Sequence, residues 1–244
     1  MDTLEITYCF KTGATDPVEF RLELDSGTLA LPRPEGEIPD WAGLTFRQCP
    51  NCPLSPEDVP NCPAAAHLSR LVEALNHLVS FDRVRVEVTT AQRVVSKEVS
   101  TQQGMGALMG LIMATSGCPI TTFFRPMARF HLPFATQDET IFRAASTYLL
   151  ADFFRVRERG GEMDLALDGL TAIYREVHAM NQAFFQRLKA AARTDASLNA
   201  LVHLDSFALM LPLQAQHALP ALAEYFRPFL EGFPPPGEWE EGNR

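Results

Sequence analysis

Four cysteines, each followed directly by proline, have the residue type and spacing best suited to chemistry. Cys49 and Cys52 form a Cys-x-x-Cys pair, Cys62 follows after nine further residues, and Cys118 follows after another fifty-five. A Cys-x-x-Cys turn directs two sulfur atoms towards one point and favours the thiolate form that binds metal. Four thiolates suit a tetrahedral zinc ion or a 4Fe-4S cluster. We therefore expect Cys49, Cys52, Cys62 and Cys118 to form a metal site.

The identity of the metal rests on spacing alone. Structural zinc usually takes two paired knuckles, whereas this chain has one pair and two single cysteines, and this difference favours an iron-sulfur cluster. The familiar local runs of cluster-binding cysteines are absent, and free cysteine is also a common buried residue without metal. We expect an iron-sulfur cluster with a redox, sensing or structural role. The alternative is zinc that stabilises a protein-interaction domain.

A basic segment follows the last of these cysteines. Arg125, Arg129 and His131 lie within thirteen residues of Cys118 among mostly apolar neighbours, and charged groups in such surroundings need partners. The simpler explanation is ion pairs with the acidic N-terminal part of the chain. The functional one is that the arginines offset the charge of a thiolate centre or hold an anionic ligand, with His131 as a fifth candidate ligand. On that hypothesis Arg125 and Arg129 are the cofactor-binding residues.

The same segments carry a family resemblance. The motif Cys-Pro-x-Cys-Pro-Leu at 49–54, with the Gly-Cys-Pro and the run Arg-Pro-Met-Ala-Arg-Phe-His-Leu-Pro-Phe within 117–134, resembles an uncharacterised bacterial family. The resemblance implies no known activity, so it assigns no role to any residue. It implies only that the two segments form one unit.

An enzyme with a substrate pocket between two portions of the chain is a further alternative. Tyr148 with Asp152, and Tyr174 with His178, are spaced so that each pair lies on one face of a helix, and both pairs suit acid-base chemistry. Such pairs are more often structural or solvated. The chain has no Gly-x-Ser-x-Gly elbow, Walker loop or His-Glu-x-x-His motif. The sequence therefore leaves open whether the protein catalyses a reaction.

The cysteines have to be positioned by the elements around them. Alternating apolar and polar residues predict an antiparallel sheet, and a helical pattern follows the cysteine-rich loop. We expect strands over 4–10, 18–24, 28–31 and 84–88, and a helix over 63–79. Eight prolines interrupt residues 32–63, so an irregular loop is expected there. A loop of this length is unusual in a compact domain, and a metal cross-link would explain why it is ordered.

Helical patterns dominate the rest of the chain. Capping boxes, Ser100 with Gln103 and Thr136 with Glu139, open two helices. The glycines after the first box predict close helix packing, because the strand-turn-helix context of a dinucleotide loop is missing. Apolar residues recur every three or four positions over 166–188, which predicts a long amphipathic helix.

The predicted fold class is α+β. A small antiparallel N-terminal sheet with one helix occupies residues 1–92, including the Pro/Cys-rich loop 32–63, and a helical portion occupies 93–232. The proline-rich tail, 233–244, is predicted to be disordered.

Composition and charge exclude several functions. The 244 residues are 46% hydrophobic and 21% charged, as in globular domains, and 30 acidic against 21 basic residues give a net charge of -9. This charge disfavours binding to nucleic acid or to anionic lipid. No signal peptide is apparent, and the longest weakly polar run is about half of the roughly 20 residues that cross a bilayer. We expect a cytoplasmic protein without nucleic-acid or membrane partners; a protein partner or homo-oligomer stays open.

Overall fold

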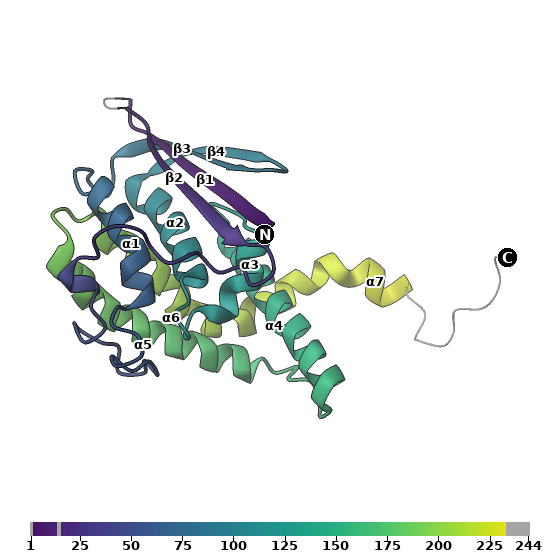
Figure 1. Ribbon diagram of the computed structural model, residues 1–244. Helices are drawn as coiled ribbons and strands as arrows, with labels where there is room; N and C mark the ends of the chain where they lie inside the picture. The colour runs from purple at the N-terminus through teal and green to yellow at the C-terminus, as the bar shows by residue number, and fades with distance from the viewer. Residues whose placement is uncertain (1, 14–15, 233–244) are drawn as a thin grey trace.

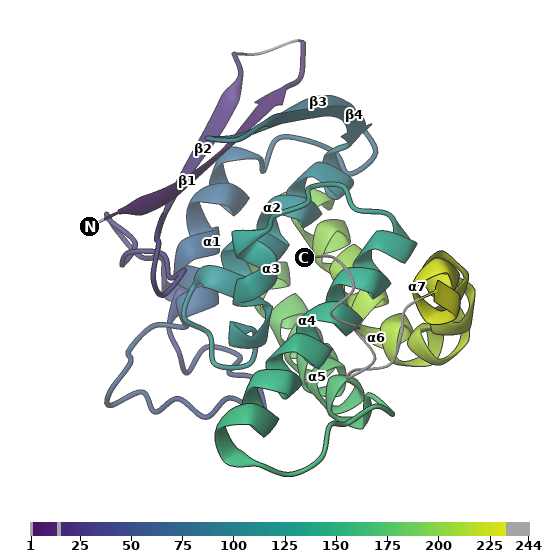
Figure 2. The same cartoon turned by 90° about the vertical axis from the view of Figure 1, so that its right-hand side faces the viewer.

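The computed structural model describes residues 2–13 and 16–232, with the backbone alone described for 212–221. A sheet lies at one end of the molecule, and helices pack beneath one face of it (Figures 1 and 2). The predicted α+β class, an N-terminal antiparallel sheet followed by a mostly helical part, is confirmed. The predicted tail, 233–244, lies outside the described residues.

The sheet has four antiparallel strands in the order β2-β1-β3-β4. These strands are β1 (Thr3–Lys11), β2 (Val18–Asp25), β3 (Arg83–Thr90) and β4 (Val94–Ser100). The side chains of Ile6, Tyr8 and Phe10 on β1 are buried under the sheet, whereas the residues between them are more exposed. This alternation is the period of a strand with one covered face, and it confirms the predicted hairpin.

The predicted strand over 28–31 is wrong, and the fourth strand is β4. The Oδ1 atom of Asp25 accepts hydrogen bonds from the backbone nitrogens of Gly27 (3.2 Å) and Thr28 (2.7 Å), which closes a turn and leads the chain away from the sheet. In β4 only Val99 is buried, so its sequence shows little alternation. The boundary predicted at 92/93 falls in the turn that joins β3 to β4.

Seven α-helices and three short 3-10 helices are described. The helices are α1 (Pro63–Ala74), η1 (Asp40–Ala42), α2 (Thr101–Thr115), η2 (Thr122–Phe124), α3 (Arg125–Arg129), α4 (Gln137–Arg159), α5 (Asp168–Ala191), α6 (Ala196–Ala223), η3 (Glu224–Phe226) and α7 (Arg227–Gly232). The amphipathic helix predicted over 166–188 is α5. Helix α6 continues through Pro212, although proline commonly interrupts a helix.

Helix α2 lies between the sheet and the other long helices (Figure 1). Its predicted capping box is present: Ser100 Oγ accepts a hydrogen bond from the Gln103 backbone nitrogen. A Cβ atom at Gly104 would lie 2.9 Å from Val86 Cγ2 and 3.0 Å from Phe10 Cε1. Glycine at this position therefore lets α2 approach the sheet closely, which is the packing role that the sequence predicted.

The apolar core is one continuous cluster. It contains inward side chains of the sheet, such as Tyr8 and Val86, together with Leu68 of α1, Leu108 of α2 and Phe184 of α5. The same core thus joins the sheet to the helical portion.

Candidate functional site

The four cysteines do not form the predicted metal site. Among the residues that the structure describes, no group of three or more His, Cys, Asp or Glu side chains could hold a metal ion. Cys62 and Cys118 are part of the apolar core, and Cys49 and Cys52 pack against it. The prediction of an iron-sulfur cluster, and the alternative of a structural zinc, are therefore wrong.

Burial favours the protonated form of two of these thiols. Burial raises the pKa of Cys49 to about 12, and the charges that Cys62, Cys118 and Cys52 would carry raise it further. Burial likewise raises the pKa of Cys62, although the backbone amide of Ala65 and the Arg187 guanidinium oppose this shift. These cysteines are protonated at neutral pH and pack as small apolar side chains.

The proline-rich loop is held by α5 instead of by a metal. Arg187 of α5 is 1% exposed, and its guanidinium donates hydrogen bonds to the carbonyl oxygens of Trp41 (2.7 Å), Gly43 (2.7 Å) and Leu44 (3.3 Å). Later in the same loop, the side chain of Asn51 donates a hydrogen bond to the backbone oxygen of Glu176 on α5, at 3.0 Å. These bonds supply the cross-link that the length of the loop requires.

The two arginines predicted to bind a cofactor lie at either end of α3. Neither Arg125 nor Arg129 forms an ion pair with a described residue. The Nε atom of Arg125 is buried without a hydrogen-bond partner in the described part of the chain, and the Arg129 guanidinium lies 6.0 Å from the centre of the Phe130 ring. Their contact with an anionic ligand stays a prediction.

The tyrosine pairs suggested for acid-base chemistry have structural partners. Tyr148 donates a hydrogen bond to Asp164 (2.6 Å), and Asp152 accepts bonds from Arg155 Nε (2.6 Å) and the Asp164 backbone nitrogen (2.7 Å). This network fastens the connection between α4 and α5. Burial, followed by the hydrogen bond to Asp164, raises the pKa of Tyr148 to about 12, so its hydroxyl stays protonated.

The second pair is separated in the structure. His178 Nδ1 lies 2.9 Å from Asp205 Oδ1 on α6, and the Gln182 side chain contacts its other ring nitrogen at 3.0 Å. Tyr174 is buried and faces a different region, a cavity described below. The two residues therefore do not act together.

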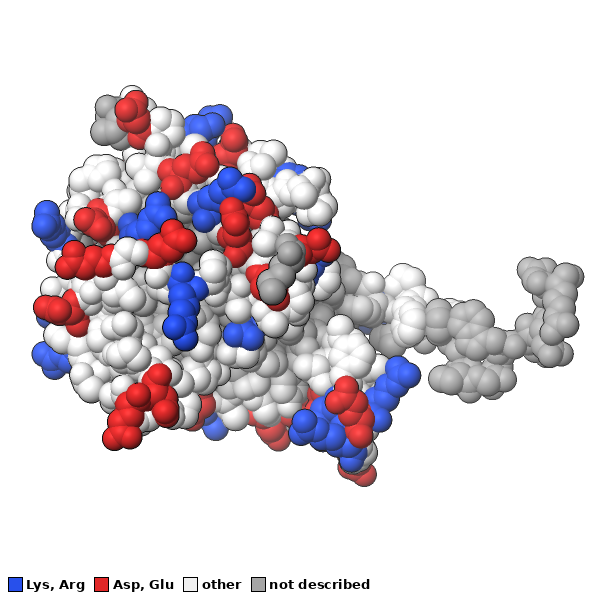
Figure 3. Space-filling view, in the orientation of Figure 1, with Lys and Arg blue, Asp and Glu red and all other residues white. Residues whose placement is uncertain are grey.

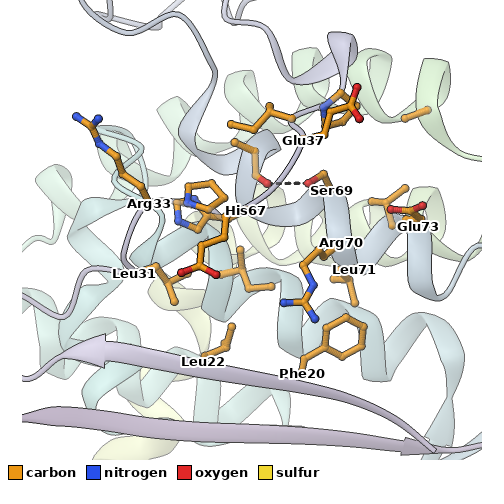
Figure 4. Close-up of a pocket in the computed structure, with 18 of the residues that line it drawn as sticks. Phe20, Leu22, Leu31, Arg33, Glu37, His67, Ser69, Arg70, Leu71 and Glu73 are labelled. Carbon is orange, nitrogen blue, oxygen red and sulfur yellow. Dashed lines mark hydrogen bonds between the residues drawn. The ribbon is translucent and has the colours of Figure 1, made fainter.

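One cavity, which we call the loop pocket, lies between β2, residues 31–39 and α1, and has a volume of about 690 Å³. Figure 4 shows Phe20 and Leu22 pointing from β2 towards α1, from which Arg70 reaches towards Phe20. The arginines and glutamates that line it are equal in number: Arg21, Arg33, Arg70, Arg193, Glu23, Glu35, Glu37 and Glu73. This balance gives the pocket no preference for ligands of either charge.

Both ring nitrogens of the histidine that lines the loop pocket already have hydrogen-bond partners in the chain. One ring nitrogen of His67 lies 2.7 Å from the Pro63 carbonyl oxygen, and the other lies 2.9 Å from that of Pro32. His67 therefore ties the start of the loop to α1 and is not available to a ligand.

A second cavity, the central pocket, lies between β4, α2, α5, α6 and residues 131–136, and has a volume of about 640 Å³. Its lining is largely apolar. Representative side chains are Leu132, Phe134, Val177, Met180, Leu204 and Phe207. Small residues of α2, namely Gly106, Ala107 and Gly110, form part of its wall and leave the space open. A cavity of this size with a mainly apolar lining is typical of a small-molecule site.

A few polar groups converge on the central pocket. Arg143 of α4 is half-buried and donates hydrogen bonds to the carbonyl oxygens of Met127 (2.8 Å) and Phe130 (3.4 Å). Beside it lies His131, whose Nε2 atom is 2.6 Å from the hydroxyl of the fully buried Tyr8. Burial, followed by the charge of Arg143, lowers the pKa of His131 to about 4, so this histidine is neutral at pH 7.

The charge of the central pocket is opposite to that of the whole protein. Its charged side chains are Arg83, Lys97, Glu98 and Arg143, three basic and one acidic, whereas the chain carries a net charge of -9. On the face shown in Figure 3, acidic and basic side chains are interspersed. The pocket is therefore locally suited to an anionic group on an apolar molecule.

Sequence reasoning named His131 and Tyr174 but missed Arg143 and Tyr8. Tyr8 carried a signal, because it alternates with Ile6 and Phe10 on the covered face of β1, and a buried tyrosine hydroxyl requires a partner. Arg143 carried none, since an arginine within a helical pattern is usually a solvated residue.

The fold and the central pocket define an α+β protein with a largely apolar cavity between its sheet edge and its helices. The chain belongs to the family described as a domain of unknown function, DUF6901, whose model matches residues 6–227. No curated protein and no solved structure matches the chain. Membership of an uncharacterised family agrees with the resemblance seen in the sequence, while the family's cysteine motif stays a prediction.

No helix in the described residues is long and apolar enough to cross a lipid bilayer. A cytoplasmic location, and the lack of a nucleic-acid partner, stay predictions.

Proposed function

We propose that this protein binds an apolar small molecule in the central pocket. The observation that carries the proposal is a cavity of about 640 Å³ whose walls are mainly aliphatic and aromatic side chains. The pocket opens to solvent, so its apolar walls are exposed to water while it is empty, and a contiguous exposed apolar surface commonly marks a binding site. A ligand that fills the cavity covers these walls and removes its own apolar surface from water.

The glycine and alanine residues of α2 support the same function. Gly106, Ala107 and Gly110 all line the central pocket, and a Cβ atom at Gly110 would come no closer than 3.4 Å to any neighbouring atom. That nearest atom is Leu204 Cδ2 of α6, which also lines the pocket. Gly110 therefore lies where α2 packs against α6 at the pocket wall.

Binding of the neutral, environment-sensitive dye Nile red tests this proposal. We expect fluorescence enhancement that saturates at one dye per protein chain, and loss of this binding in Ala107→Phe, whose ring would fill the pocket. The matched control is Ala172→Phe, at an exposed position of α5 outside the pocket, which should bind the dye as the wild type does. Unchanged dye binding by Ala107→Phe would contradict the proposal.

A further inference from the structure

We propose that the ligand of the central pocket is a long-chain compound with one carboxylate group, and that this carboxylate binds beside Arg143. The inference rests on the proposed function, because the apolar walls hold the chain of the ligand. It goes further by naming the head group that the polar end of the pocket recognises.

The first argument is that Arg143 forms no ion pair with any residue in the described part of the chain. Its hydrogen bonds are to two backbone oxygens, those of Met127 and Phe130, and no acidic side chain lies within ion-pair distance of it. A half-buried guanidinium always carries its charge, and a carboxylate matches its planar set of donors. An anionic ligand would supply the missing charge.

The acidic residues nearest to Arg143 are engaged elsewhere. Glu139, one turn earlier on α4, accepts a hydrogen bond from the Thr136 backbone nitrogen at 2.7 Å and so caps its own helix. Glu98, which lines the pocket from β4, pairs with Arg83 at 3.4 Å. Glu139 therefore acts on Arg143 only through its charge at a distance, and neither carboxylate forms an ion pair with the guanidinium in the described residues.

Two further donors lie near Arg143. Tyr174 of α5 lines the pocket near Arg143, and its hydroxyl forms no hydrogen bond with any residue that the structure describes. Nε2 of the neutral His131 is taken up by the Tyr8 hydroxyl at 2.6 Å, and in the tautomer that carries its proton on Nδ1 the ring has a second donor. These groups can donate to the oxygens of a carboxylate held by Arg143.

The number of charges decides between a carboxylate and a phosphate. Arg143 is the cation set among apolar residues. His131 is neutral at pH 7, Lys97 is exposed on β4, and Arg83 is exposed and paired with Glu98. Arg143 therefore neutralises the single negative charge of a carboxylate. A phosphate dianion would keep one negative charge unpaired in an apolar site. The walls beyond Arg143 are apolar, as an alkyl chain requires.

Three ligands with the same alkyl chain test the proposal: dodecanoate, dodecanol and dodecyl phosphate, each titrated at pH 7.5 as a competitor of Nile red. We expect dodecanoate to bind at least about tenfold more tightly than dodecanol, because a charge-assisted pair with Arg143 is gained. We expect dodecyl phosphate to bind more weakly than dodecanoate.

Variants of the full chain assign the preference to these residues. In Arg143→Met the preference for dodecanoate over dodecanol should disappear while dodecanol binding is kept. Tyr174→Phe removes one hydroxyl without changing the shape of the residue, and should reduce the preference for dodecanoate several-fold. If Arg143→Met does not fold, Tyr174→Phe alone tests whether the polar end of the pocket causes this preference. The matched control, Arg175→Met, removes an exposed arginine of the same helix as Tyr174 and should keep the full preference.

The outcomes separate the two proposals. If dodecanol binds as tightly as dodecanoate, or if both Arg143→Met and Tyr174→Phe keep the preference, the carboxylate site is overturned while the apolar pocket stands. If dodecyl phosphate binds most tightly, the single-charge argument is overturned. If no alkyl ligand competes and Nile red does not bind, the proposed function itself fails.

Discussion

At the scale of single residues, the pair of Tyr8 and His131 shows how burial sets protonation at the central pocket. The Tyr8 hydroxyl lies 2.6 Å from His131 Nε2, and burial raises the pKa of Tyr8 while it lowers that of His131. Both shifts favour the neutral form, because charge is costly away from water. The hydrogen bond therefore joins two neutral groups.

This pair predicts a pH dependence of stability. The pKa of His131 is about 4 in the folded protein and roughly 6.5 in an unfolded chain, so the unfolded state binds more protons between these values. The contribution of His131 is complete above pH 6.5 and is lost as the pH falls to 4. We expect this loss to be of the order of 1 to 3 kcal/mol, measured by urea unfolding at several pH values.

The variant His131→Gln isolates this effect. Glutamine offers Tyr8 an acceptor but does not titrate, so the decrease in unfolding free energy between pH 6.5 and 4 should become smaller. The exposed His77→Gln serves as the control and should leave the decrease unchanged. An equal decrease in wild type and His131→Gln would show that other groups cause it.

At the scale of elements, the contact between α5 and the proline-rich loop replaces the cross-link expected from metal. Arg187 satisfies three carbonyl oxygens of residues 41–44 and also packs over the Phe46 ring, 5.9 Å from its centre. The loop adds its own backbone bonds, such as that from Leu44 to Pro60 (2.8 Å). One buried side chain thus organises a segment that cannot form regular structure.

Replacing this arginine should destabilise the protein strongly. Arg187→Met keeps an apolar chain of similar length but removes the guanidinium donors from three carbonyl oxygens, of which that of Gly43 still accepts from the Phe46 backbone nitrogen. We expect a loss of about 2 to 4 kcal/mol of unfolding free energy. Urea unfolding measures this loss, and limited proteolysis should show faster cleavage within residues 32–61. Lys189→Met, at an exposed position on the same helix, should change neither. Wild-type stability of Arg187→Met would mean that other contacts hold the loop.

At the scale of the whole molecule, the core crosses the boundary between the predicted portions. Val86 and Phe10 of the sheet contact the position of Gly104 on α2, and α2 packs against α6 on its other side. The buried cluster includes residues of the sheet, α1, α2, α4, α5 and α6. A shared core couples the stability of its parts.

We therefore expect the chain to unfold in a single step. Urea transitions followed by far-UV circular dichroism, which reports mainly the helices, and by near-UV circular dichroism, which reports the packed aromatic residues, should coincide. The control is a fragment of residues 93–232, which should not fold alone because it lacks the sheet that covers α2. Two separate transitions, or a folded fragment, would instead support two independent domains at the predicted boundary.

The sequence by itself determined the class of the fold and most of its elements. The alternation of Ile6, Tyr8 and Phe10, the capping boxes and the long apolar period of α5 are local patterns, and local patterns set the type of an element. The same patterns identified Gly104 as a packing residue. They missed β4, because its exposed residues lack alternation.

Only the tertiary structure decided the site. The sequence pointed to Cys49, Cys52, Cys62 and Cys118, because their spacing is visible along the chain, but in the structure they pack in or against the apolar core. The central pocket instead depends on Arg143, which meets Tyr174 and His131 from different elements. Convergence of residues distant in sequence depends on how the helices pack against the sheet, and no local pattern encodes that packing.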